Sequence, residues 1–227
     1  MPKYIFNGDS VFHNGSWETI RSLMSVLSPE EFNELAGEKA VDFFLETHRF
    51  CGICGSRTEP APDREIKYAL RCSSAGCAGH SRFMYPSYSI ASITLVTRKK
   101  GKELLLAHNT AWPSDRVSLL AGFMQPGETL ENCVRREIKE ECGLDLLSVR
   151  YINSQPWPFP SNIMTGFYAE AADGEARPDG TELDRIIWVT RDELRKIQEG
   201  TSETGLVMPR RGSLARRLAE MWLNGKI

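Results

Sequence analysis

Three glutamates lie within five consecutive residues of the chain, at Glu137, Glu140 and Glu141. In a helix, which turns about 100° per residue, their side chains fall within roughly 100° of one another. Two unit charges about 4 Å apart repel by roughly 4 kcal/mol at an effective dielectric near 20, so these carboxylates need a counter-charge or would keep protons. Mg²⁺ or Mn²⁺ suits such oxygen ligands better than zinc, and Mg²⁺ commonly binds substrate phosphates as well. The glutamates therefore indicate both a divalent cation and a phosphate substrate.

A helix is predicted around the glutamates. Its apolar residues recur at every fourth position, namely Leu130, Val134 and Ile138. The opposite face carries Asn132, Arg135 and Lys139. Gly143 follows as a natural C-cap. An acidic run on a helix is usually a solvated face, but here other residues already occupy that face. The glutamates are expected beside the apolar stripe.

Two pairs of cysteines precede this helix. Cys51 and Cys54 form a CxxC pair, and four residues separate Cys72 from Cys77. Four thiolates in two close pairs suit a tetrahedral structural Zn²⁺ with no open ligand position. The second pair departs from the commoner CxxC spacing, and His80 follows Cys77 by three residues. The sequence favours the four-cysteine set and leaves open a set in which His80 replaces one cysteine.

Composition restricts the classes of protein to consider. The 227 residues carry a formal net charge of −2, and the pI is near 6.1, so no global basic character indicates nonspecific nucleic-acid binding. No stretch of about 18 apolar residues and no signal-peptide core is present, which predicts a cytoplasmic protein without a membrane segment. In that compartment cysteines are metal ligands or reduced thiols more often than disulfides. Cys133 and Cys142, on the predicted helix, are expected to be core thiols.

Two longer motifs carry a family resemblance. Residues 122–144, GFMQPGETLENCVRREIKEECGL, fit the Nudix box without a gap, and residues 154–160 read SQPWPFP. A zinc ribbon, a Nudix box and SQPWPFP in this order resemble the NADH pyrophosphatase branch of the Nudix hydrolase superfamily. That branch includes enzymes that remove NAD caps from RNA. The resemblance covers roughly residues 46–227.

The resemblance implies roles for individual residues. Metal ligands would be the backbone carbonyl of Ala121 and the side chains of Glu137, Glu140, Glu141 and Glu182. Arg136 would orient a catalytic glutamate through a bidentate pair. Phe123 and Tyr85 would sandwich a ring of the substrate, with Tyr85 donated across a homodimer interface. Further substrate contacts would come from Gln155, Pro156, Trp157, Pro158, Phe159, Pro160, Ser161, Asn162 and Ala215.

Three departures from the branch pattern are visible. The segment from Tyr85 keeps Tyr-Pro but lacks the Arg and the acidic residue that usually follow. The substrate loop ends in Ser161-Asn162 rather than Gln-Ser, which alters groups expected near a phosphate or ribose. The part before the ribbon is only about 47 residues, shorter than the usual N-terminal domain.

The predicted architecture is an α/β/α sandwich around a mixed sheet, preceded by a zinc ribbon. The expected divisions are a short N-terminal region (1–47), the ribbon (48–86) and a Nudix domain (87–227). The N-terminal region should contain polar turns, then helices over Trp17–Leu27 and Pro29–Leu35. A short strand is expected at Lys67–Arg71. Later strands are expected at Ser89–Thr97, Glu103–Ala107, Ser118–Ala121, 146–153, 163–171 and 185–189, with helices opening after Thr190 and Ser213.

The leading hypothesis is a metal-dependent NAD(H) diphosphatase that yields nicotinamide mononucleotide and AMP. Two or more Mg²⁺ or Mn²⁺ ions would clamp the diphosphate, activate a water and neutralise the leaving phosphate. A glutamate or the activated water itself would complete the deprotonation, and the sequence leaves both open. Removal of NAD caps from RNA is the same cleavage on a longer substrate. The alternatives are hydrolysis of ADP-ribose or dinucleoside polyphosphates, and a non-catalytic NAD-binding sensor, against which the intact glutamate set argues.

Overall fold

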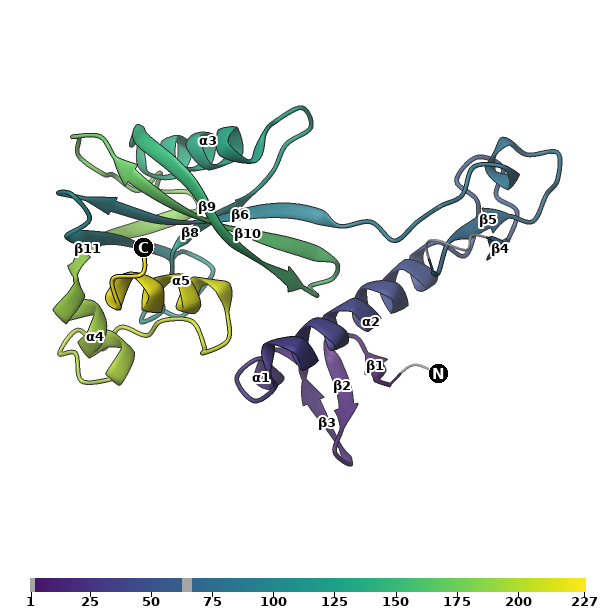
Figure 1. Cartoon of the computed structure of the whole chain (residues 1–227), viewed down its shortest axis with the longest axis horizontal. Coiled ribbons are helices and arrows are strands. Elements are labelled where there is room, and N and C mark those ends of the chain that lie inside the picture. Colours follow the sequence, from purple (N-terminus) through teal and green to yellow (C-terminus); the bar gives the residue numbers. More distant parts are fainter. Residues whose placement is uncertain (1–2, 63–66) are drawn as a thin grey trace. The chain divides into compact units, whose positions relative to one another are not determined.

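A computed structural model gives the fold, and it describes residues 3–62 and 67–227. The chain divides into two compact units. The first comprises Met1–Ser89 and the returning segment Pro156–Asn162, and the second comprises Ile90–Gln155 and Ile163–Ile227. Figure 1 labels most of the helices and strands of both units.

The first unit begins with a three-stranded antiparallel sheet of β1 (Ile5–Asn7), β2 (Ser10–His13) and β3 (Ser16–Thr19). The turn between β2 and β3 is Asn14-Gly15, with φ values of 48° and 86°. Asn and Gly tolerate this left-handed conformation, which suits a tight hairpin. The polar turns predicted from sequence in this region therefore join strands.

The helix predicted from Trp17 is wrong at its start. Trp17 lies in β3, paired with Phe12, and α1 (Ile20–Leu23) begins only after the N-cap Thr19. The large side chains of Trp17 and Phe12 contact each other edge to face, with ring centroids 5.6 Å apart. This cross-strand pairing outweighs the helical preference of the segment.

The second predicted helix starts as expected but is much longer. In α2 (Pro29–Thr47), Ser28 and Glu31 form a capping box, and Pro29 occupies the first turn. The helix continues beyond Leu35 because Ala36, Ala40 and Phe44 extend its buried face.

No helix in residues 3–62 or 67–227 has the length and hydropathy that a bilayer crossing requires.

The cysteine-rich segment contains a two-stranded sheet of β4 (Thr58–Pro60) and β5 (Leu70–Cys72) and a short 3₁₀ helix, η1 (Ala78–His80). The strand expected at Lys67–Arg71 begins later, at Leu70. Tyr68 has a φ of 71°, a left-handed conformation that does not fit an extended strand.

The second unit is built on a six-stranded mixed sheet, which confirms the predicted fold class. Its order is β11-β7-β6-β10-β9, and β8 pairs with β6. The strands are β6 (Ser89–Arg98), β7 (Glu103–Asn109), β8 (Leu120–Phe123), β9 (Leu146–Trp157), β10 (Asn162–Ala171) and β11 (Leu183–Thr190).

Helices cover both faces of this sheet (Figure 1). α3 (Leu130–Cys142) packs on one face, and α4 (Arg191–Glu199) and α5 (Leu214–Leu223) pack on the other. β7 illustrates the alternation: Leu104 and Leu106 join the core beneath α4 and α5, whereas Leu105 joins the core beneath α3. This layering holds α3, with its glutamates, firmly against the sheet.

Local capping signals appear where the sequence predicted them. Gly143 ends α3 with a φ of 73°, as expected, and Thr129 is an additional cap at its start. Thr190 and Glu193 form a capping box at α4, and the Ser213 side chain accepts a hydrogen bond from the backbone N–H of Arg216 at α5.

Candidate metal and nucleotide site

The three glutamates of α3 differ sharply in exposure. Glu141 is 5% exposed, the Glu137 side chain is 14% exposed, and the Glu140 side chain is 59% exposed. Oε2 of Glu141 is buried without a hydrogen-bond partner among the described residues. An unpaired buried carboxylate oxygen is costly. Of the three glutamates, Glu141 would therefore be stabilised most by a bound cation.

Burial and mutual repulsion alter the proton affinity of these groups. Desolvation, followed by the negative charges of Glu137, Glu182, Asp179 and Glu140, raises the pKa of Glu141 to about 8. Desolvation also raises the pKa of Glu137, although Arg136 opposes that change. A divalent cation beside them would lower the pKa of both carboxyl groups and so favour their charged forms.

Arg136 connects the loop before α3 to the helix itself. Its Nε and Nη2 donate to Oε1 and Oε2 of Glu128 at 2.6 and 3.0 Å, a bidentate pair. Its Nη1 donates to Glu137 at 2.7 Å and to Glu140 at 2.9 Å, and Nη2 also donates to the Phe123 carbonyl. Arg136 lowers the pKa of Glu128 to about 2. The guanidinium thus fixes the positions of the loop and two glutamates.

Gly122 brings the backbone of β8 against the Glu137 carboxylate. A Cβ at this position would overlap the carboxyl group of Glu137, so only glycine allows the approach. Ala121, the expected carbonyl ligand, is exposed in β8 and pairs with Ile93 of β6. The unsatisfied Glu141 oxygen and this close approach fit an oxygen-ligated divalent cation such as Mg²⁺.

Glu182 is exposed and lies just before β11 in a turn that Asp179 organises. The Asp179 carboxylate accepts from the backbone N–H groups of Glu182 and Leu183 and from the Thr181 hydroxyl. The Asp179 N–H donates to the Glu141 carbonyl at 3.1 Å. One residue therefore links the end of α3 to the segment that carries Glu182. Sequence reasoning missed this role, although Asp-Gly is a turn signal.

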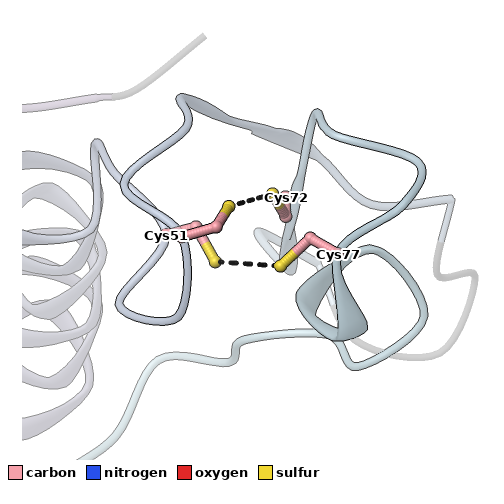
Figure 2. Close-up of side chains that lie close together, drawn as sticks. Cys51, Cys72 and Cys77 are labelled. Atoms are coloured by element: carbon pink, nitrogen blue, oxygen red, sulfur yellow. Dashed lines mark hydrogen bonds between the residues drawn. The ribbon is translucent and has the colours of Figure 1, made fainter.

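The four predicted zinc ligands converge. The sulfurs of Cys51, Cys54, Cys72 and Cys77 all lie within 4.8 Å of one another, and this cysteine set is the one such cluster within the described residues. Sγ–Sγ distances are 3.9 Å for Cys51–Cys77 and 3.5 Å for Cys54–Cys72. Sulfurs 2.3 Å from a tetrahedral zinc would be about 3.8 Å apart. Figure 2 shows the thiols directed at one another.

His80 is not part of that cluster. Its Nδ1 lies 2.7 Å from the carbonyl oxygen of Cys72, a hydrogen bond that fixes the ring. Hydrogen bonds from the Ser56 side chain and backbone, with smaller contributions from the other cysteines, lower the pKa of Cys54 to about 6, whereas desolvation raises the pKa of Cys72 to about 12. A thiolate at neutral pH is the form a metal requires. The four cysteines could hold a metal, and the structure does not bring His80 into the set.

The two aromatics expected to sandwich a ring belong to different units. Phe123 ends β8 in the second unit and is 56% exposed, whereas Tyr85 is 40% exposed in the first unit. Each therefore presents ring surface to solvent.

Two expected substrate contacts lie in the packed interior of the second unit. Gln155 is 4% exposed, its Nε2 donates to the Gly212 carbonyl at 2.9 Å, and its Oε1 accepts from the Leu214 N–H at 2.7 Å. Ala215, in the first turn of α5, is also 4% exposed. The Gln155 amide thus holds the start of α5, a role that its sequence position did not indicate.

The remainder of the SQPWPFP loop packs within the first unit. Trp157 and Phe159 contact each other edge to face and pack against the core formed by the N-terminal sheet and helices. The guanidinium carbon of Arg21 lies 3.9 Å from the Phe159 ring centroid and 5.5 Å from that of Trp157. Sequence reasoning did not single out Arg21, since no local signal couples it to residues far along the chain.

The end of the loop is held by its own hydrogen bonds. The Ser161 hydroxyl donates to the Ser87 carbonyl at 2.9 Å, and Nδ2 of Asn162 donates to the Phe159 carbonyl at 2.7 Å. Both side chains are buried. Among the three prolines, Pro158 is buried, Pro156 is half-buried and Pro160 is exposed.

Comparison with known proteins places these features in a family. The model of the NUDIX domain matches residues 88–210. A protein from Stutzerimonas stutzeri (strain A1501) named NAD-capped RNA hydrolase NudC is 38% identical over 207 residues, covering 91% of this chain and 67% of the relative. A protein of the same name from Photobacterium profundum is 35% identical, covering 86% and 70%.

A solved structure supports the same fold. The crystal structure of a NUDIX hydrolase from Nitrosomonas europaea has a TM-score of 0.54 and 18% sequence identity, and the match covers 77% of this chain and 90% of that chain. The family match spans more than half of the 227 residues and includes β8 and α3, with the three glutamates of α3. The chain belongs to the NUDIX family.

Proposed function

We propose that this protein is a metal-dependent hydrolase that cleaves the diphosphate of NAD(H), giving nicotinamide mononucleotide and AMP, and that it cleaves the same bond in RNA with an NAD cap. The observation that carries the chemistry is the buried, unpaired Oε2 of Glu141 beside Glu137. Relatives named NAD-capped RNA hydrolase, 35–38% identical over most of the chain, support the substrate class.

Mg²⁺ or Mn²⁺ would be held by Glu137, Glu140, Glu141 and Glu182 with the Ala121 carbonyl. When bound, the cation supplies positive charge for the diphosphate and lowers the pKa of a water. Glu141 contributes a carboxylate whose second oxygen has no other partner in the described structure, and Glu137 contributes one pressed against the Gly122 backbone. Arg136 is a positioning residue, since its bonds run to Glu128, Glu137 and Glu140.

The ribbon would hold a structural Zn²⁺ through Cys51, Cys54, Cys72 and Cys77. Four protein thiolates leave no ligand position for a substrate, so this metal stabilises the fold and takes no part in cleavage. The sulfur separations of 3.5 and 3.9 Å support this assignment.

The substrate ring would stack on Phe123, and Tyr85 from a second copy of the chain would cover its other face. The exposure of both rings, 56% and 40%, supports this arrangement. A homodimer would then be required for full activity. In the loop expected to contact substrate, Trp157 and Phe159 are half-buried, so part of each side chain is open to solvent.

Product analysis tests the proposal. The protein is incubated with Mn²⁺ and, separately, NADH, ADP-ribose and NAD-capped RNA, and the products are resolved by chromatography. Nicotinamide mononucleotide from NADH and a 5′-monophosphate RNA from the capped RNA are expected. Preferred cleavage of ADP-ribose would overturn the substrate assignment, and binding of NAD without any cleavage would identify a sensor. Glu141→Gln serves as the inactive control. Glu131→Gln makes the same change at an exposed glutamate of α3 and should remain active.

A further inference from the structure

The cysteine-rich segment differs in charge from the remainder of the chain. Residues 48–86 contain six Lys or Arg and three Asp or Glu, a net charge of +3, whereas the whole chain carries −2. All other residues together therefore carry −5. A basic module in an acidic protein attracts polyanions locally, although the global charge does not.

Apolar and basic side chains are exposed together in one loop of this module. Phe50 is 56% exposed and Ile53 is 64% exposed, and Arg49 and Arg57 are exposed beside them. Apolar side chains of this size are normally buried. We call Arg49, Phe50, Ile53 and Arg57 the ribbon surface.

The backbone fixes these residues close to one another. Phe50 and Arg57 are direct partners in an antiparallel bridge, and the Thr58 N–H donates to the Arg49 carbonyl at 3.0 Å. The guanidinium carbon of Arg57 lies 5.6 Å from the Phe50 ring centroid. Ile53 lies in the turn between Cys51 and Cys54, which the proposed metal would hold rigid. The surface is therefore preorganised.

Among the described residues, the guanidinium groups of this surface, those of Arg49 and Arg57, have no carboxylate partner. Arg71 of the same module behaves differently, since Glu59 accepts from it at 2.9 Å. Two unpaired guanidinium groups beside an exposed ring favour an anionic ligand with flat, stackable groups.

We propose that the ribbon surface binds the single-stranded RNA that follows the NAD cap. Single-stranded nucleic acid is bound by basic residues along its phosphates and by side chains on which bases stack, without reading the sequence. Arg49 and Arg57 contact phosphates, Phe50 carries a base, and Ile53 extends the apolar platform. This inference rests on the proposed function for the identity of the RNA. Charge complementarity favours RNA over a protein partner.

A binding experiment tests the surface without relying on catalysis. Fluorescence anisotropy measures the Kd of a labelled, uncapped single-stranded RNA of about 16 nucleotides, an upper site size for small single-strand-binding domains. Phe50→Ala/Arg57→Ala should weaken binding about fivefold or more. The slope of log Kd against log salt should fall by about 0.7 for each phosphate that the variant no longer neutralises. Arg57→Lys keeps the charge and should restore the slope.

Kinetics separate RNA binding from the chemistry. The kcat/KM of the double variant for NAD-capped RNA should fall by the same factor as its affinity for RNA, while its kcat/KM for NADH should stay at the wild-type level. Phe12→Ala, which removes another exposed aromatic, and Lys102→Ala, which removes another exposed positive charge, should change neither value. Metal content per chain is measured for each variant. If the double variant loses its metal, Arg57→Ala alone carries the test.

Two results would overturn the proposal. Unchanged RNA affinity in the double variant would remove RNA as the ligand and leave the surface to a protein partner. A parallel loss of activity on NADH and on capped RNA would assign Phe50 and Arg57 to folding. If the wild-type protein cleaves no capped RNA, the proposed function fails, but anisotropy with uncapped RNA still decides whether the ribbon surface binds RNA.

Discussion

Gly122 and Glu137 lie so close that a Cβ on residue 122 would overlap the Glu137 carboxyl group. The contact joins β8, which carries the proposed carbonyl ligand, to α3, which carries the carboxylates. Both elements pack on the same core, and Nη1 of Arg136 donates to Oε1 of Glu137 at 2.7 Å. Arg136 therefore holds the Glu137 carboxylate in place while it contacts the β8 backbone.

Gly122→Ala should lower kcat/KM at least tenfold, because the Glu137 carboxylate must leave its position. The measurement is hydrolysis of NADH at saturating Mn²⁺, with a thermal melt. Gly174→Ala is the control, since its Cβ would meet its nearest neighbour, Leu144, at an ordinary 3.7 Å. Wild-type activity in Gly122→Ala would show that the position of Glu137 is unimportant for cleavage.

The metal-free protein should lose stability as pH rises from about 5 to 8. The folded state keeps a proton on Glu141 up to its pKa of about 8, whereas the unfolded chain releases it near the ordinary value of 4.5. The folded state binds more protons over this interval, so the free energy of unfolding falls with rising pH. Thermal melts in a chelator of divalent cations that spares the ribbon metal measure this effect.

Glu141→Gln should flatten that dependence, because it removes the titrating group while keeping its shape. Mn²⁺ should raise the melting temperature of the wild type more at pH 8 than at pH 6, since binding requires the deprotonated carboxylate. A pH dependence that persists unchanged in Glu141→Gln would assign it to other groups.

Asp179→Ala should weaken cation binding while leaving kcat at saturating Mn²⁺ largely intact. Asp179 holds the turn before Glu182 and bonds to the Glu141 carbonyl through its backbone N–H, so its carboxylate sets the spacing of two proposed ligands. Electron paramagnetic resonance of free Mn²⁺ measures the affinity directly. Asp179→Asn keeps one acceptor oxygen, so its affinity for Mn²⁺ should lie between those of Asp179→Ala and the wild type. Equal Mn²⁺ affinity in Asp179→Ala and wild type would contradict this role.

Elemental analysis should return about one zinc per chain. Cys77→Ser should lose it and lower the melting temperature, because a structural zinc contributes directly to folding. His80→Ala should keep it, since the His80 ring is bonded to the Cys72 carbonyl and stands outside the sulfur cluster. Zinc loss in His80→Ala would favour the ligand set that contains the histidine.

Phe123→Ala and Tyr85→Ala should each lower kcat/KM about 5- to 150-fold, the range for loss of a stacking partner worth about 1–3 kcal/mol. If Tyr85 comes from a second copy, mixing Tyr85→Ala with Glu141→Gln should restore activity. In a symmetric dimer, random mixing gives about a quarter of the wild-type rate, because one site in each heterodimer is complete. No recovery after mixing would mean that Tyr85 serves its own chain.

Local signals in the sequence were sufficient for α3 and its caps. Leu130, Val134 and Ile138 define the buried stripe, and Gly143 ends the helix with a positive φ. These features depend on residues three or four positions apart, so helix geometry alone relates them. The same holds for the capping boxes at α2 and α4.

Contacts between distant residues were decided only by tertiary structure. Trp17 pairs with Phe12 on the neighbouring strand, and the Gln155 side chain accepts a hydrogen bond from the first residue of α5. The Arg21 guanidinium lies over the Phe159 ring. The bond between Asp179 and Glu141 spans 38 positions in the sequence. No periodicity encodes such pairs, because each depends on how separate elements pack. The sequence thus determined which groups form the candidate site, whereas packing decided which carboxylate is buried and unpaired, and hence which one most needs a cation.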